Sequence, residues 1–101
     1  MLTKFRDERN WNQFHNTKDL ALALSIEAAE LNELFLWKSR EEAENCNKEK
    51  LREELADVFA YAFLLAEKHK LNVKEIVKHK VALNAKKYPV EKSKNSAKKY
   101  N

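Results

Sequence analysis

Apolar residues recur along this chain at the spacing of α-helices. Between residues 20 and 34, members of one stripe are separated by four, three, four and three residues, which places them on one helical face. The members are Leu20, Leu24, Glu27, Leu31 and Leu34. Residues 55–66 are apolar almost throughout, as in a helix covered on every side. The pattern predicts four helical segments, at about 3–14, 17–37, 50–69 and 72–88.

Capping residues mark the helix ends. Three pairs have the spacing of a capping box at a helix N-terminus, namely Asn16 with Asp19, Ser39 with Glu42, and Asn72 with Glu75. The polar stretch 41–50 is interpreted as a connection that can hold a short helical turn. Pro89 ends the last helix, because proline disfavours helix at the preceding residue. We predict one domain over 1–88 and a basic C-terminal tail over 89–101.

The composition agrees with an all-α protein. The 101 residues suffice for one domain, and glycine, on which tight strand turns depend, is absent. Cys46 is the single cysteine and cannot form an internal disulfide, which fits a reducing compartment. The sequence begins without the apolar stretch of a signal peptide, and no uncharged run could span a bilayer. We expect a cytoplasmic protein without a membrane partner.

Positive charge is concentrated at the C-terminal end. The net charge is +4, and residues 80–101 contain seven lysines and one glutamate. One interpretation is a small basic module that binds nucleic acid through this end. That interpretation leaves the acidic residues described next unexplained, so we do not expect a nucleic-acid partner.

Four acidic residues occur as pairs in the most apolar segments. Glu27 and Glu30 interrupt the first stripe, and Asp57 interrupts the continuous apolar stretch three residues after Glu54. An ionised carboxylate in such surroundings must be protonated, paired or bound to a cation. Basic side chains that could pair with these acids are missing nearby, and oxygen ligands suit Mg²⁺ or Mn²⁺. The pattern indicates a metal site, either in an enzyme or in a non-catalytic metal-binding or partner-binding dimer.

One face of the last helical segment changes from apolar to polar along its length. Its stripe of Val73, Ile76 and Val77 continues through Lys80, Asn84 and Lys87. This face could meet a phosphate chain and a base edge, or it could be a solvated helix end. The aromatic residues are equally open, because Trp11 and Trp37 could stack on a base or anchor a core.

In these blocks the chain resembles the all-α MazG-like nucleotide pyrophosphohydrolases, and most of all their short dCTP pyrophosphatase branch. The carrying motif is E-x-x-E followed by E-x-x-D, at Glu27–Glu30 and Glu54–Asp57. Further blocks match in order: Arg9-Asn-Trp11-Asn-Gln-Phe14-His15, Glu30-Leu-x-Glu33-Leu-Phe-x-Trp37-Lys38 and Lys80-x-x-x-Asn84-x-x-Lys87-Tyr88-Pro89. Two departures bear on the nucleotide pocket: Asn10 replaces the family's aspartate, and Asn16-Thr17 replaces a proline after the histidine.

The resemblance implies a four-helix bundle, assembled as a dimer or a dimer of dimers. The activity it implies is hydrolysis of nucleoside triphosphates, dCTP-like or non-canonical dNTPs, to monophosphate and pyrophosphate. The implied Mg²⁺ ligands are Glu27, Glu30, Glu54 and Asp57. Phosphate contacts are implied for Tyr61, Lys80 and Lys87, and a base and sugar pocket for Trp11, His15, Trp37 and Asn84.

Charge considerations suggest how such a reaction would proceed. Metal ions held by the acids would neutralise phosphate oxygens and acidify a water, which would attack the α-phosphorus in line. Either Glu30 or Glu33 would be the general base for that water. Lys80 would stabilise the charge that leaves on pyrophosphate.

Overall fold

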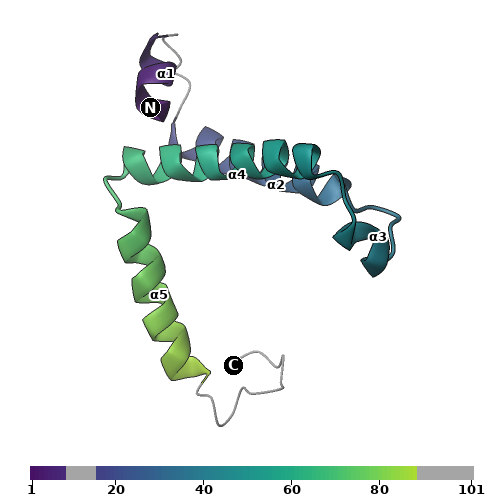
Figure 1. The fold of residues 1–101 in the computed structure, drawn as a ribbon. Helices are drawn as coiled ribbons and strands as arrows, with labels where there is room; N and C mark the ends of the chain where they lie inside the picture. Colours follow the sequence, from purple (N-terminus) through teal and green to yellow (C-terminus); the bar gives the residue numbers. More distant parts are fainter. Residues whose placement is uncertain (9–15, 89–101) are drawn as a thin grey trace. The chain divides into compact units, whose positions relative to one another are not determined.

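The computed structural model describes residues 1–8 and 16–88, and every regular element among them is an α-helix. The helices are α1 (Leu2–Glu8), α2 (Thr17–Glu33), α3 (Arg40–Glu44), α4 (Lys48–Lys68) and α5 (Val73–Lys87), labelled in Figure 1. The prediction of an all-α protein is confirmed. The short helix α3 occupies the stretch interpreted as a connection with a helical turn.

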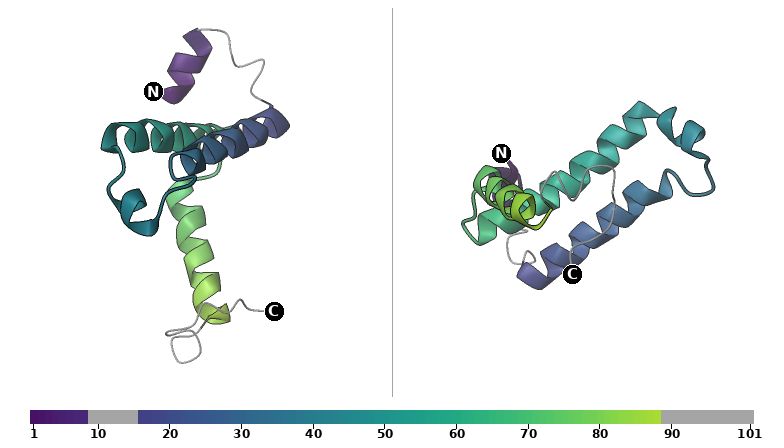
Figure 2. Two further views of the ribbon diagram at one scale, coloured as in Figure 1. Left: turned by 90° about the vertical axis from the view of Figure 1, so that its right-hand side faces the viewer. Right: turned by 90° about the horizontal axis from the view of Figure 1, so that it is seen from below.

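Helices α2 and α4 form the packed part of the chain. They lie side by side in Figures 1 and 2, and a hydrogen bond of 2.8 Å between Thr17 Oγ1 and His69 Nε2 joins the start of α2 to the residue after α4. The two helices are therefore antiparallel. All five members of the stripe that starts at Leu20 are buried or half-buried, whereas their neighbours on α2 are mostly exposed. The predicted face of α2 is thus the face that packs on α4.

Side-chain caps begin the helices where the sequence predicts them. The side-chain oxygens of Asn16 and Asn72 accept the backbone N–H groups of Asp19 and Glu75 at 2.8 and 3.0 Å. Ser39 forms a complete capping box at the start of α3. Each cap satisfies an amide that the first helical turn leaves without a partner. Helix α4 has a cap that the capping-box pattern did not reveal, from Asn47 to the N–H groups of Glu49 and Lys50.

Helix α2 ends earlier than predicted. Its last residue is Glu33, and residues 34–37 form a turn, whereas the apolar pattern extended the helix to about Trp37. Trp37 has a φ of 65° and Lys70 a φ of 55°. Because the chain has no glycine, these residues take the left-handed conformation that a helix end commonly requires. A bulky residue in this region stores about 1–2 kcal/mol of strain.

The chain divides into two units, residues 1–69 and residues 70–101. In the first unit the hairpin of α2 and α4 leaves large apolar side chains uncovered. Among the described residues only Leu20, Leu64 and Ala66 are buried apolar side chains, and Phe59 is 53% exposed. The expectation that residues 55–66 are covered on every side is therefore not met within one chain, because a two-helix hairpin covers only one face of each helix. No helix in the described part is long and apolar enough to cross a membrane.

Candidate metal centre

Three carboxylates meet where α2 packs against α4. Glu27 and Glu30 lie one turn apart on α2, and Glu54 faces them from α4. One oxygen of each lies within 4.8 Å of the others. Glu27 is a member of the packed stripe, and Glu54 is half-buried between Leu51 and Val58 on the packed side of α4. Packing of the two apolar faces therefore forces these acids together.

Two oxygens in this group are buried and have no hydrogen-bond partner. They are Oε2 of Glu27 and Oε2 of Glu54, the only such atoms among the side chains that the structure describes. A buried acceptor without a donor is destabilising, and here each of the two packed helices contributes one. A cation between them would remove both penalties at once. The donor set, consisting only of carboxylates, fits a hard divalent cation such as Mg²⁺ or Mn²⁺.

The acids shift one another's protonation. Burial raises the pKa of Glu27 from 4.5 to about 7, helped by a side-chain hydrogen bond with Glu30 and by the negative charges of Glu30, Asp57 and Glu54. Burial also raises the pKa of Glu54, followed by the charges of Glu30 and Asp57. Below a pH of about 7 Glu27 therefore retains a proton that a bound cation would displace.

Asp57 lies beside this group rather than inside it. It follows Glu54 by one turn of α4 and is exposed, and its charge reaches both Glu27 and Glu54. Glu30 is also exposed. The apolar surroundings that the sequence predicts for the acids are therefore absent around Glu30 and Asp57 in the single chain, because only the α2–α4 side of these helices is covered.

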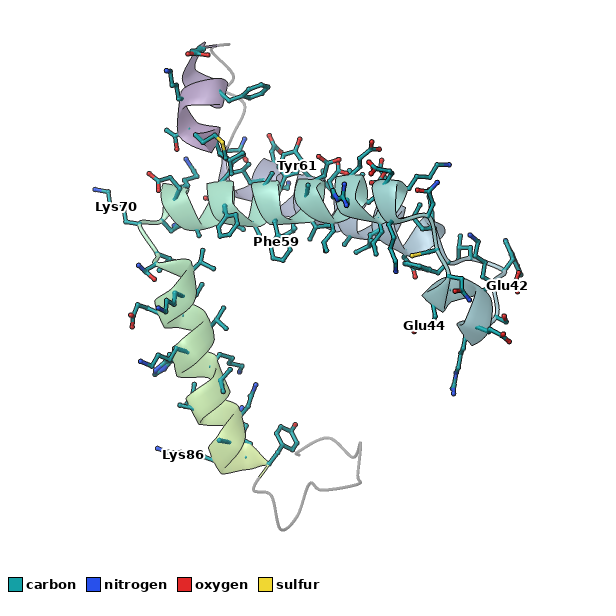
Figure 3. All side chains as sticks on the ribbon, viewed as in Figure 1. Glu42, Glu44, Phe59, Tyr61, Lys70 and Lys86 are labelled. Atoms are coloured by element: carbon teal, nitrogen blue, oxygen red, sulfur yellow. The ribbon has the colours of Figure 1, made fainter. Side chains whose placement is uncertain are left out.

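The remaining predicted site residues are distributed over several elements. Tyr61 is half-buried on α4, one turn beyond Asp57, and projects to the side opposite Phe59 (Figure 3). Trp37 is 99% exposed in the turn after α2. Lys80, Asn84 and Lys87 are exposed on α5, which belongs to the second unit. Trp11 and His15 lie outside the described residues.

A hollow that the sequence did not reveal opens beside the carboxylates. Its volume is about 310 Å³. It is lined by Glu33, Leu34, Lys38, Cys46, Asn47 and Lys50. Glu33, one of the two predicted general bases, is exposed at this hollow rather than grouped with Glu27, Glu30 and Glu54. The sequence feature that could have pointed to this hollow is Lys50, which lies one helical turn before Glu54.

Comparison with known proteins agrees with the helical fold and the acidic motif. The model of the MazG-like family matches residues 22–101. The chain belongs to the MazG-like family. It is 39% identical to dCTP pyrophosphatase 1 of Bos taurus and 40% identical to that of Rattus norvegicus, each over 96% of this chain. This chain spans 60% of the length of both relatives.

A solved structure supports the same fold. A pyrophosphatase from Archaeoglobus fulgidus superimposes with a TM-score of 0.84 at 41% sequence identity. The match covers 87% of this chain and 85% of that one. The MazG-like architecture of the chain is therefore supported by both sequence and structure.

Proposed function

We propose that this MazG-like chain hydrolyses nucleoside triphosphates to monophosphates and pyrophosphate, with dCTP-like or non-canonical dNTPs as substrates and Mg²⁺, or alternatively Mn²⁺, as cofactor. The observation that carries the proposal is the group of Glu27, Glu30 and Glu54, with two buried oxygens that lack partners. The similarity to proteins named dCTP pyrophosphatase supports the substrate class. Removal of unwanted nucleotides from the pool is the corresponding role, and we expect it in the cytoplasm.

Glu27, Glu30 and Glu54 would hold the cation, and Asp57 would join them from one turn further along α4. When bound, the cation supplies charge neutralisation at phosphate oxygens and makes a water more acidic. Either Glu30, inside the group, or Glu33, one turn further along α2, would accept the proton of the attacking water.

Residues elsewhere would position the nucleotide. Lys80, Asn84 and Lys87 follow one another at intervals of four and three on α5, so they share one face of that helix. We assign Lys80 and Lys87 to phosphate oxygens, together with the Tyr61 hydroxyl. Trp11, His15, Trp37 and Asn84 are assigned to the base and sugar.

We further propose that the chain assembles as a dimer or a dimer of dimers. The rings of Phe59 and Phe63 stack on α4 with centroids 6.1 Å apart, yet they are 53% and 43% exposed. Leu22 and Ile26 on α2 are similarly uncovered. Large exposed apolar side chains of this kind mark interaction surfaces, and a second copy would cover them. Light scattering on the purified protein measures the assembly directly. The division into a domain over 1–88 and a basic tail over 89–101 stays a prediction.

The reaction is tested with a panel of canonical and modified NTPs and dNTPs, with Mg²⁺ or with EDTA. Ion-exchange chromatography separates the products. We expect Mg²⁺-dependent release of monophosphate and pyrophosphate without diphosphate, and the fastest substrate identifies the base. Diphosphate as product, or no turnover of any nucleotide, would contradict the proposal. In the second case, salt-dependent binding of nucleic acid without divalent ions becomes the next measurement.

A further inference from the structure

The hollow beside the carboxylates has the composition of an anion site. It contains two lysines and one glutamate, with Leu34 and Cys46 as less polar walls. Neither Lys38 nor Lys50 belongs to the ion pairs of the described residues, which are Lys4–Glu8 and Arg52–Glu49. Within residues 1–8 and 16–88, no ion pair therefore occupies either ammonium group.

The hollow lies one helical turn beyond the carboxylates along both α2 and α4. Leu34 follows Glu30 by four residues on α2, and Lys50 precedes Glu54 by four residues on α4. Because α2 and α4 are antiparallel, both steps lead in the same direction, toward the loop that contains α3. Each step is about 5–6 Å along its helix. A group of negative charge is thus followed directly by a group of positive charge.

The order of charges along the two helices, first the carboxylates and then the lysines, suits an extended polyphosphate that binds a divalent cation at one end. A phosphate bound through a divalent cation would lie at the carboxylates, and the next phosphates along the chain would reach Lys38 and Lys50. The positive charge comes from these side chains and not from the start of α4, because Asn47 already accepts the N–H groups of Glu49 and Lys50 at 2.9 and 3.2 Å. Lysine is a strong point charge for phosphate oxygens.

The lining favours phosphate over a nucleobase. None of the described residues that line the hollow is aromatic, so a base inside it would find no ring on which to stack. Trp37, which precedes Lys38 in the chain, is 99% exposed and does not belong to the lining. Lys38 has one competitor, since it also helps to lower the pKa of Glu42, after the hydrogen bonds from the Ser39 backbone and hydroxyl. Glu42 is exposed, and such a contact is weak in water.

We propose that Lys38 and Lys50 bind the pyrophosphate group in this hollow, both as the terminal phosphates of the substrate and as the free product. The inference rests on the proposed function for the first form only. Binding of free pyrophosphate with Mg²⁺ is independent of turnover. The two forms are separated by measuring product binding and substrate kinetics side by side.

Cys46 makes the test direct, because the single cysteine of the chain lines the hollow. The rate at which an uncharged disulfide reagent modifies the thiol is measured with Mg²⁺ alone, with Mg²⁺ and pyrophosphate, and with Mg²⁺ and dCMP. We expect pyrophosphate to slow the modification, by about tenfold at ten times its Kd, and dCMP to leave the rate unchanged. Protection by dCMP instead of pyrophosphate would assign the hollow to the nucleoside end. No protection by pyrophosphate would overturn the proposal.

Variants test the two lysines. Lys38→Ala with Lys50→Ala should weaken pyrophosphate binding about tenfold or more per lysine, and should raise the inhibition constant of pyrophosphate equally. Lys48→Ala is the matched control, because Lys48 is an exposed lysine at the same helix start that does not line the hollow. Unchanged protection in the double variant would refute the assignment. If the double variant does not fold, the single Lys→Gln variants give the same comparison.

Failure of this proposal and failure of the proposed function give different results. A protein that hydrolyses no nucleotide, yet whose Cys46 is protected by pyrophosphate through both lysines, loses the proposed function and keeps the pyrophosphate site. An active enzyme with a normal KM and normal pyrophosphate inhibition in the double variant loses the site and keeps the function.

Discussion

Replacing Glu27 by glutamine should make the metal-free protein more stable at alkaline pH while it destroys catalysis. The pKa of this carboxyl is raised from 4.5 to about 7 by burial, by its hydrogen bond with Glu30 and by the neighbouring acids. Between these two pH values the folded chain holds a proton that the unfolded chain has released. Stability therefore falls as the pH rises through this interval, and the loss is complete about one unit above pH 7.

The size of the effect follows from the shift. At about 1.4 kcal/mol for each tenfold change in proton affinity, the full shift would correspond to roughly 3.4 kcal/mol at pH 8. Glu27 is half-buried, so solvent screening reduces this to about 1–2 kcal/mol. For a chain of this size that is a gain of about 5–15 °C in Tm. Glutamine keeps the shape of the side chain and offers N–H donors to the neighbouring carboxylates.

The assay is urea unfolding of wild type and Glu27→Gln at equal protein concentration, in EDTA, at pH 5 and pH 8. We expect the variant to be more stable at pH 8 and most of that advantage to disappear at pH 5. Added Mg²⁺ should stabilise the wild type and not the variant, because the cation would lose one of its ligands. Turnover should fall below detection.

A matched control separates this effect from general charge reduction. Glu67→Gln removes an exposed glutamate outside the cluster, so its difference from wild type should be the same at both pH values. The reasoning is refuted if Glu27→Gln is less stable than wild type at pH 8, or if its advantage is equally large at pH 5.

Three further variants address other parts of the chain. Asp57→Asn should lower turnover by about 10²-fold or more. Because Asp57 is exposed beside the cluster, the variant should fold normally by circular dichroism. Near-normal turnover would exclude Asp57 from the site. Lys80→Ala should lower kcat/KM by about 10²-fold in steady-state assays, whereas the control Lys78→Ala on the same helix should leave it unchanged. Equal losses in both variants would show that the overall positive charge of α5 matters, and not the position of Lys80. Ser39→Ala removes the capping box of α3 and should cost about 1 kcal/mol in urea unfolding with kcat unchanged; no loss of stability would show that the cap is dispensable.

Local rules predicted the helical framework because the signals are local. The stripe that starts at Leu20 packs on α4, and the side chains of Asn16, Ser39 and Asn72 cap the helices at the predicted positions. These features depend on residues three or four apart, and spacing of this kind is legible in a single sequence. The end of α2 was predicted too late, because the apolar pattern continues through Leu34 to Trp37 while the backbone turns away.

The site was predictable in part for the same reason. Periodicity places Glu27 on the packed face of α2 and puts Glu30 one turn away, and it predicts that Glu54 and Asp57 share a face of the next long helix. It does not tell how many neighbours cover a helix, so the exposure of Glu30 and Asp57 was missed. The hollow was missed because two separate segments, 33–38 and 46–50, line it, and their meeting depends on the path of the loop around α3.

The helical hairpin also sets an order of events during synthesis. All four acids of the motif lie on α2 and α4, which are joined by residues 34–47 with the short helix α3, and contacts between elements close in sequence form readily. The pairing of α2 and α4 uses no residue beyond 69, so these helices can meet during synthesis before α5 is complete. Protons or the proposed divalent cation would neutralise the acids at that stage and favour pairing of the two helices, before the chain could use a cation in chemistry.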